Sequence, residues 1–176
     1  MITSLRTEPL DSLPLVRETV RATSMNIIFD LCGVLFGGNG TTNALTKGVH
    51  VIRPIDPTKT LRLLHDCSLQ GHRLFALSTW SKHFHELIKY DPWAARILSY
   101  FDDIILATET GFKKPDPRIF DHLLLKHYLD PRCCIFIDHK NDNLKGAAQA
   151  GIAKGILCLN FNITGIREDL ELHGAL

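Results

Sequence analysis

Short apolar runs alternate with longer segments of helical character along most of this chain. We predict strands over Met25–Asp30, His72–Ser78, Asp103–Ala107, Cys133–Ile137 and Lys154–Leu159, and helices over Pro57–Leu69, Lys82–Lys89, Pro92–Ser99, Pro117–His127 and Asn141–Ala150. Continuous apolar strands that alternate with helices are typical of parallel sheets buried on both faces. The alternation therefore predicts an α/β fold, a three-layer sandwich around a five-stranded parallel sheet.

Composition places the chain among ordinary globular proteins. Its 176 residues are enough for one domain with its own core, and 45% of them are hydrophobic while 22% are charged. A formal net charge of +1 gives no electrostatic signature for nucleic acid or for an anionic membrane. No apolar stretch reaches the roughly 18 residues that span a bilayer, and the N-terminus has no apolar leader. Because the five cysteines form no paired framework, we expect a cytoplasmic protein.

The chain is expected to divide into three segments. These are an N-terminal extension over 1–24, a core domain over 25–160 and a C-terminal tail over 161–176. Within the tail, residues 170–176 are expected to be a frayed end. Residues 31–56 are rich in Gly, Asn and Thr and predict a long loop. Long loops in compact domains are usually functional, and the glycine-rich part over 36–47 is a candidate for a small lid.

Polar side chains follow the ends of four predicted strands. Asp30 ends the first strand, Ser78 and Thr79 end the second, Lys114 follows the third, and Asp138 ends the fourth. Because parallel strands place their carboxyl ends on one edge of a sheet, we expect these side chains to converge. A carboxylate can attack phosphorus while a hydroxyl and an ammonium group hold the phosphate oxygens. The paired carboxylates also offer the hard oxygen ligands that Mg²⁺ prefers.

The residues around these positions resemble the motifs of the haloacid dehalogenase (HAD) superfamily, most of whose members are phosphatases. The matching residues are Phe29-Asp30-Leu31-Cys32-Gly33-Val34-Leu35, then Ser78, then Lys114-Pro115-Asp116-Pro117, and finally Asp138 through Asn143 with Ala147, Ala148 and Gly151. The resemblance covers about residues 25–160, and the motifs follow the family's order and spacing. It implies a Rossmann-like, HAD-like core built on the predicted sheet.

The resemblance also implies a role for each matching residue. Asp30 is expected to be the nucleophile, which forms an aspartyl-phosphate. Mg²⁺ is expected to bind Asp30, the backbone carbonyl of Cys32, and Asp138. The phosphoryl group of the substrate is expected to contact Ser78, Thr79 and Lys114. Asp30, Ser78 and Lys114 are therefore the predicted catalytic residues.

The first departure from the family pattern concerns the proton donor. Family phosphatases usually carry a second Asp two residues after the nucleophile, where this chain has Cys32. That Asp protonates the leaving group and then activates water. A free thiol has a pKa of about 8.5 and is a poor substitute for a carboxyl group. Loss of a positioned general acid typically costs about 10²–10⁴ in rate, so we expect slow turnover, a good leaving group or another acid.

The second departure is His139, because the family often has an acid directly after the residue that corresponds to Asp138. Our hypothesis is that His139 serves as the replacement acid or base, since histidine exchanges a proton near neutral pH. The alternative is a solvated loop histidine without a chemical role. Asp142 is a further candidate, which could support the metal ion.

The third departure is size. Only 47 residues separate Asp30 from Ser78, and only 23 separate Lys114 from Asp138. These intervals leave no room for the full cap domain that many relatives insert. An uncapped site can admit a phosphorylated small molecule or an exposed macromolecular phosphoester, or it can be closed by a partner subunit.

Three interpretations of function remain open. The leading one is a Mg²⁺-dependent phosphatase that works through Asp30. The second is a degenerate HAD-like domain that binds a phosphorylated ligand or protein partner without turnover, and Cys32 and His139 favour it. The third is carbon–halogen hydrolysis, which needs no Mg²⁺, so the presence of Asp138 at a metal position argues against it. The sequence indicates no oligomeric state.

Overall fold

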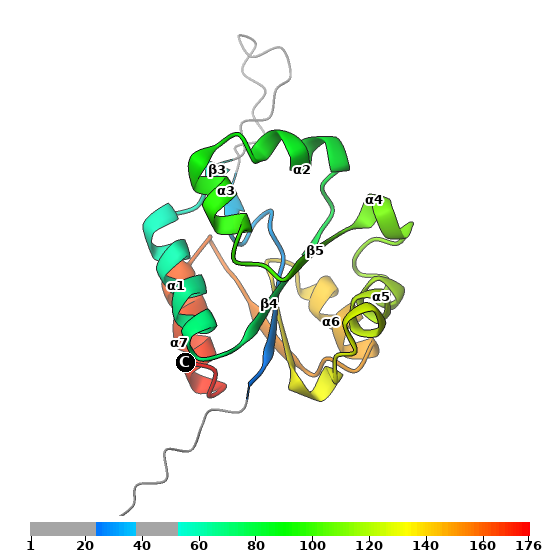
Figure 1. Ribbon diagram of the computed structural model, residues 1–176. Coiled ribbons are helices and arrows are strands. Elements are labelled where there is room, and N and C mark those ends of the chain that lie inside the picture. Colours follow the sequence, from blue (N-terminus) through cyan, green and yellow to red (C-terminus); the bar gives the residue numbers. More distant parts are fainter. Residues whose placement is uncertain (1–23, 38–52) are drawn as a thin grey trace, which may run out of the picture.

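The computed structural model describes residues 24–37 and 53–176 (Figure 1). Its centre is a sheet of five parallel strands in the order β5-β4-β1-β6-β7. The strands are β1 (Asn26–Phe29), β4 (Arg73–Ser78), β5 (Asp103–Leu106), β6 (Cys134–Asp138) and β7 (Lys154–Leu157). The predicted five-stranded parallel sheet is confirmed, and each strand lies close to its predicted bounds.

The central strand β1 is buried on both faces. Ile27 and Phe29 belong to the apolar cluster on one face of the sheet, and Ile28 belongs to the cluster on the other. All three side chains are fully buried. Successive side chains of a strand point to opposite faces, so a strand covered on both sides needs an unbroken apolar run. This requirement explains why the sequence before Asp30 shows no polar alternation.

Helices cover both faces of the sheet (Figure 1). They are α1 (Pro57–Leu69), α2 (Lys82–Ile88), α3 (Pro92–Leu98), α4 (Ala107–Thr110), α5 (Pro117–His127), α6 (Asn141–Gln149) and α7 (Ile163–Leu172), with a 3-10 turn over Pro131–Cys133. α1 and α7 pack on one face, with α3 beside α1, and α5 and α6 pack on the other. Within the described part of the chain, no helix is both long and apolar enough to cross a membrane.

The segment predicted as one long loop contains two short strands. β2 (Phe36–Gly37) and β3 (Arg53–Pro54) form an antiparallel pair that the sequence analysis missed. Phe36 is fully buried and packs edge-on against Trp80, with 5.1 Å between ring centroids. This aromatic contact ties the start of the segment to the core. Most of the predicted lid lies outside the described residues, which stop at 37 and resume at 53.

The C-terminal segment is a packed helix, so the prediction of a frayed end over residues 170–176 is wrong. α7 buries Ile163, Ile166 and Leu170, which are spaced along one helical face. They pack in the same cluster as α1. Ala175 is also fully buried, and its carbonyl oxygen lies 2.5 Å from His72 Nε2. The proposed division of the chain at residues 24 and 160 stays a prediction.

Candidate active site

Asp30 and Asp138 lie side by side at the carboxyl edge of the sheet. Asp30 follows β1 directly, and Asp138 is the last residue of the neighbouring strand β6. The strand register pairs Phe29 with Ile137, so Asp30 and Asp138, the next residue in each strand direction, lie at equivalent positions at the carboxyl ends of the two strands. β4 and β5 lie on one side of β1, and β6 and β7 lie on the other. Open α/β sheets bind ligands at such a switch in strand order.

Lys114 joins the two carboxylates. Its Nζ lies 2.7 Å from Asp30 Oδ1 and 2.8 Å from Asp138 Oδ2. All three side chains are buried. The loop that carries Lys114 approaches α6 at Gly146, where an added Cβ would overlap the carbonyl of Pro115. Because Gly146 has no side chain, this loop can pack closely against α6 near both aspartates.

His139 closes the other side of this cluster. Its Nδ1 lies 2.9 Å from Asp30 Oδ2 and 3.5 Å from Asp138 Oδ1. The imidazole ring lies against Gly33, which has a φ of 98° and where an added Cβ would overlap the ring. Only glycine adopts such a φ readily, and only glycine leaves room for the ring. The loop histidine therefore contacts the predicted nucleophile directly.

The two aspartates differ in how firmly they are held. Asp138 accepts hydrogen bonds from the backbone N–H of Lys140, from Asn143 Nδ2 and from Lys114, each at 2.8 Å. The side-chain contacts of Asp30 are with Lys114 and His139. Sequence analysis quoted Asn143 within a motif but assigned it no role; its signal was its position five residues after Asp138. Asp142 was a candidate metal support, yet its carboxylate pairs with Lys145 at 2.9 Å and is largely exposed.

Ser78 and Thr79 occupy different environments at the end of β4. Ser78 is fully buried, and its Oγ accepts a hydrogen bond from the backbone N–H of Trp80 at 3.1 Å. Thr79 lines the pocket above Asp30. Both residues stay predicted phosphoryl contacts, and Thr79 is the one that faces the pocket directly.

A pocket of about 320 Å³ opens above Asp30. Its lining includes Cys32, Thr79, Lys114 and His139. Burial, together with the nearby Asp30 carboxylate, raises the pKa of the Cys32 thiol. This thiol is therefore protonated at neutral pH and holds its proton more tightly than a free cysteine. The pocket thus contains a strong candidate nucleophile and a weak candidate acid.

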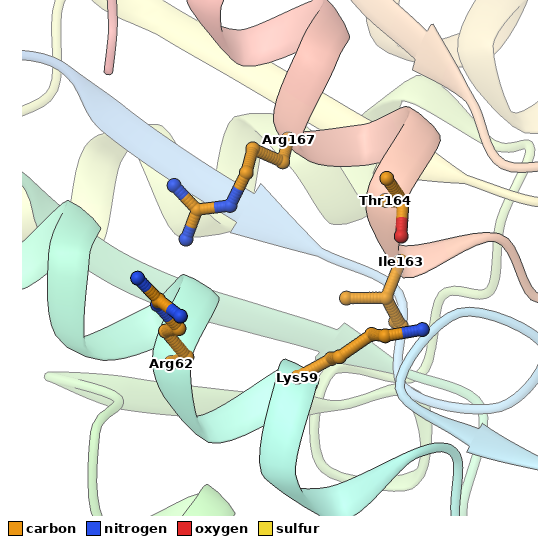
Figure 2. A pocket seen from close by; sticks show the side chains of 5 residues that line it. All are labelled: Lys59, Arg62, Ile163, Thr164 and Arg167. Atoms are coloured by element: carbon orange, nitrogen blue, oxygen red, sulfur yellow. The ribbon is translucent and has the colours of Figure 1, made fainter.

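A second pocket lies between α1 and α7 (Figure 2). It has a volume of about 270 Å³, and its lining residues are Lys59, Arg62, Ile163, Thr164 and Arg167. Figure 2 shows the side chains of Arg62 and Arg167 extending toward one another from the two helices. Arg167 also pairs with Asp66 at 2.5 Å. This pocket shares no lining residue with the pocket at Asp30 and is lined by no carboxylate, so the candidate nucleophile and metal ligands lie elsewhere.

Comparison by sequence relates the chain to a phosphatase. No protein-family model matches the sequence. The chain is 29% identical over 122 residues to a glyceraldehyde 3-phosphate phosphatase from Methanothermobacter thermautotrophicus. The match covers 68% of this chain and 50% of the relative, so the chain spans about half the length of that protein.

Comparison by structure decides the fold. A protein from Porphyromonas gingivalis, described as a predicted HAD-like family hydrolase, superposes with a TM-score of 0.67 at 18% identity over 85% of this chain and 98% of its own. The chain has the HAD-like hydrolase fold. A HAD family enzyme from Bacteroides thetaiotaomicron, solved with magnesium and inorganic phosphate, superposes with a TM-score of 0.65 at 18% identity, over 79% of this chain and 96% of its own.

Within the described residues, no large inserted domain covers the pocket at Asp30. The chain between Lys114 and Asp138 consists of α5, the 3-10 turn and β6 with their connections. After β3, only α1 precedes β4. The described segments therefore contain no full cap domain, as the spacing of the motifs predicted.

The residues at the HAD-like site fit a divalent cation. Asp30 and Asp138 bring two buried carboxylates together, and Lys114 supplies one buried ammonium group between them. Buried carboxylates are normally paired with cations or coordinate a metal ion, and these two carboxylates with one ammonium group leave one formal negative charge for a metal ion or a neighbouring imidazole to balance. Asp30, Asp138 and His139 also place ligand atoms within 4.8 Å of one another. The donor set therefore agrees with the predicted metal site.

Proposed function

We propose that this protein is a phosphatase that hydrolyses phosphoric monoesters through an aspartyl-phosphate on Asp30, with Mg²⁺ as its cofactor. The observation that carries the proposal is the buried contact of Asp30 with Lys114, beside Asp138 and at the base of a pocket. The phosphatase from Methanothermobacter thermautotrophicus supports the reaction class. HAD-like folds host several reactions, so the argument rests on the site residues.

The proposed reaction has two displacement steps. A carboxylate oxygen of Asp30 forms a bond to phosphorus while the bond from phosphorus to the leaving oxygen breaks. Water then attacks the phosphorus atom, releases inorganic phosphate and restores the Asp30 carboxylate. Asp138 is held by three hydrogen-bond donors and is fully buried, whereas Asp30 lines the pocket. This difference is why we assign the nucleophile to Asp30 rather than to Asp138.

Charge at the phosphoryl group is the main obstacle to this reaction. Lys114 lies 2.7 Å from Asp30, where its ammonium group offsets charge on the nucleophile and on a nearby phosphoryl oxygen. Asp30, Asp138 and the backbone carbonyl of Cys32 would hold Mg²⁺. When bound, the cation would neutralise further negative charge on the phosphoryl group. Thr79 and Ser78 stay the proposed hydroxyl contacts of that group.

The proton for the leaving group has no strong donor in the proposed mechanism. Cys32 occupies the expected position, but burial and the nearby Asp30 carboxylate raise the pKa of its thiol, so it gives up a proton reluctantly. We therefore propose slow turnover of alkyl phosphates and faster turnover of aryl phosphates, whose leaving groups need little protonation. The hypothesis that His139 replaces the acid stays a prediction, and unchanged turnover of His139→Ala at every pH would contradict it.

The open pocket supports a phosphorylated small molecule or an exposed macromolecular phosphoester as substrate. Glyceraldehyde 3-phosphate, named for the relative, is the first natural compound to assay. We also propose that the protein works in the cytoplasm. All five cysteines are free thiols, as expected in a reducing compartment.

The deciding experiment is hydrolysis of a generic aryl phosphate with and without Mg²⁺. We expect Mg²⁺-dependent turnover by the wild type and none by Asp30→Asn. Cys32→Asp restores a carboxyl acid, so its turnover should rise about tenfold or more, most clearly with an alkyl phosphate. Cys32→Ser is the matched control, because it changes the thiol without supplying an acid. Circular dichroism checks that each variant is folded.

A different outcome would favour the second candidate function. If the wild type does not turn over and only Cys32→Asp does, the protein is a binding domain for a phosphorylated ligand whose catalytic acid is missing. The substitution at Cys32 and the contact of His139 with Asp30 are the observations that favour this candidate. Retained activity in Asp30→Asn would instead overturn the assignment of the nucleophile.

A further inference from the structure

The imidazole nitrogen Nδ1 of His139 lies beside the two buried carboxylates of the active site. His139 Nδ1 is 2.9 Å from Asp30 Oδ2 and 3.5 Å from Asp138 Oδ1. These three residues bring one ligand atom each to within 4.8 Å of one another. The group therefore combines two oxygen donors with one imidazole nitrogen, whereas the predicted Mg²⁺ site used oxygen donors alone.

One oxygen of each carboxylate points to Lys114, away from His139. Lys114 Nζ contacts Asp30 Oδ1 and Asp138 Oδ2, and Asn143 Nδ2 also donates to Asp138 Oδ2. Asp30 Oδ2 and Asp138 Oδ1 lie on the side of His139, and Asp138 Oδ1 also accepts a hydrogen bond from the backbone N–H of Lys140. A cation that balances the second carboxylate charge would thus be bound on the side where the imidazole nitrogen lies.

The backbone supports this placement of the imidazole. Gly33 has a φ of 98°, and an added Cβ there would overlap the His139 ring at Nδ1. The ring therefore lies directly over the turn that follows the nucleophile. A neutral imidazole that carries its proton on Nε2 would present the Nδ1 lone pair to a cation bound between it and the two carboxylate oxygens.

We propose that His139 is a metal ligand through Nδ1 and makes this site prefer a first-row transition cation, such as Mn²⁺, Co²⁺ or Zn²⁺, over Mg²⁺. Imidazole suits transition ions, whereas Mg²⁺ is bound almost entirely through oxygen and gains little from a nitrogen donor. The inference rests on the proposed function only in placing a cation at Asp30 and Asp138. It also excludes proton transfer by Nδ1, because a metal-bound nitrogen has no free lone pair.

The test is direct detection of the nitrogen ligand with Mn²⁺ alone, on the metal-free full-length chain. Pulsed electron paramagnetic resonance of the bound Mn²⁺ should show coupling to ¹⁴N in the wild type. The coupling should vanish in His139→Asn and in His139→Asp. His139→Asp keeps an oxygen donor at this position and should still bind Mn²⁺. His122→Asn, which removes an exposed histidine of α5, is the matched control and should keep the coupling.

Affinity provides a second readout that does not depend on activity. Calorimetric titration should show that His139→Asn lowers Mn²⁺ affinity by about 10–100-fold and leaves Mg²⁺ affinity nearly unchanged. The proposal is overturned if Mn²⁺ does not bind, if bound Mn²⁺ shows no nitrogen coupling in the wild type, or if the coupling persists in His139→Asn. None of these outcomes decides whether the protein is a phosphatase, which the Asp30→Asn assay tests separately.

Discussion

At the scale of single residues, the site depends on close contacts between groups that are distant in the sequence. Asp30, Lys114 and His139 lie in three separate loops, yet the Asp30 carboxylate is within hydrogen-bonding distance of both Lys114 and His139. Two glycines make these approaches possible, Gly33 beneath the imidazole and Gly146 beside the Lys114 loop. Substitutions at either glycine should therefore disturb the site without removing any of its polar side chains.

Gly33→Ala should destabilise the protein and displace His139. The added methyl group overlaps the imidazole ring, and a φ of 98° is strained for any residue that carries a Cβ. Overpacking of this kind typically costs about 1–3 kcal/mol in the free energy of unfolding. Urea denaturation measures the loss, and Mn²⁺ affinity reports the displacement of the ring.

Gly71→Ala is the control for backbone strain. Gly71 has a φ of 80°, and an added Cβ there meets nothing within 4 Å. The Gly71→Ala variant should be destabilised by backbone strain alone and should keep the Mn²⁺ affinity of the wild type. An equal loss of Mn²⁺ affinity in both variants would contradict the assigned contact between Gly33 and His139.

At the scale of elements, α7 is the more informative of the two α-helices that the sequence did not predict, α4 and α7. α7 carries Ile163, Ile166 and Leu170 at helical spacing, a pattern that was visible in the sequence. The segment was predicted as a tail because it follows the last strand and the last family motif. Short isolated helices are only marginally stable in water. α7 is stable because its apolar face is buried against α1 and the sheet.

Leu170→Ala should lower stability substantially. Leu170 is fully buried in the cluster shared with α1, and truncation of a buried leucine costs about 2–5 kcal/mol in the free energy of unfolding. Leu172→Ala is the matched control on the same helix, because Leu172 is 85% exposed and should change stability by no more than about 0.5 kcal/mol. Equal urea midpoints for the two variants would mean that α7 is not docked.

At the scale of the whole molecule, the sheet is held to its helices by charge as well as by apolar packing. Asp103 begins β5, and its Oδ2 lies 2.7 Å from Lys126 Nζ and 2.6 Å from His127 Nε2 of α5. Burial raises the pKa of Asp103, but the hydrogen bonds from Lys126 and His127 outweigh it and hold the pKa below its ordinary 3.8. This carboxylate therefore stabilises the fold while it is ionised.

The contribution of Asp103 should disappear in acid. Because its pKa is lower in the folded protein than in the unfolded chain, its stabilisation is complete above the unfolded value and is lost as pH falls through the folded value. Asp103→Asn should cost up to about 1 kcal/mol at pH 7 for this partly exposed cluster. The difference in the free energy of unfolding between Asp103→Asn and the wild type should become smaller below a pH of about 4. Urea denaturation from pH 7 to pH 3 measures this difference, and Asp121→Asn, which changes an exposed aspartate, is the control. A difference that does not depend on pH would contradict the stabilising role assigned to the ionised Asp103.

The sequence by itself determined the order along the chain of the five parallel strands and of α1, α2, α3, α5 and α6, together with the positions of the polar residues at the strand ends. These features depend on local patterns, namely apolar runs before Asp30 and Asp138 and helix-starting prolines such as Pro57 and Pro117, so they are readable without neighbours. The position of Lys114 after the third strand was likewise enough to predict that it would converge with the two aspartates at one edge of the sheet.

Only the tertiary structure decided which atoms meet. In the folded protein His139 contacts Asp30, and Asp142 pairs with Lys145. Thr79 lines the pocket, whereas the Ser78 hydroxyl contacts the backbone of Trp80. Helix α7 packs against the core. Each of these outcomes depends on side-chain direction and on packing between segments far apart in the chain. A one-dimensional pattern does not carry that information, because distances of a few ångströms are set by the whole surrounding structure.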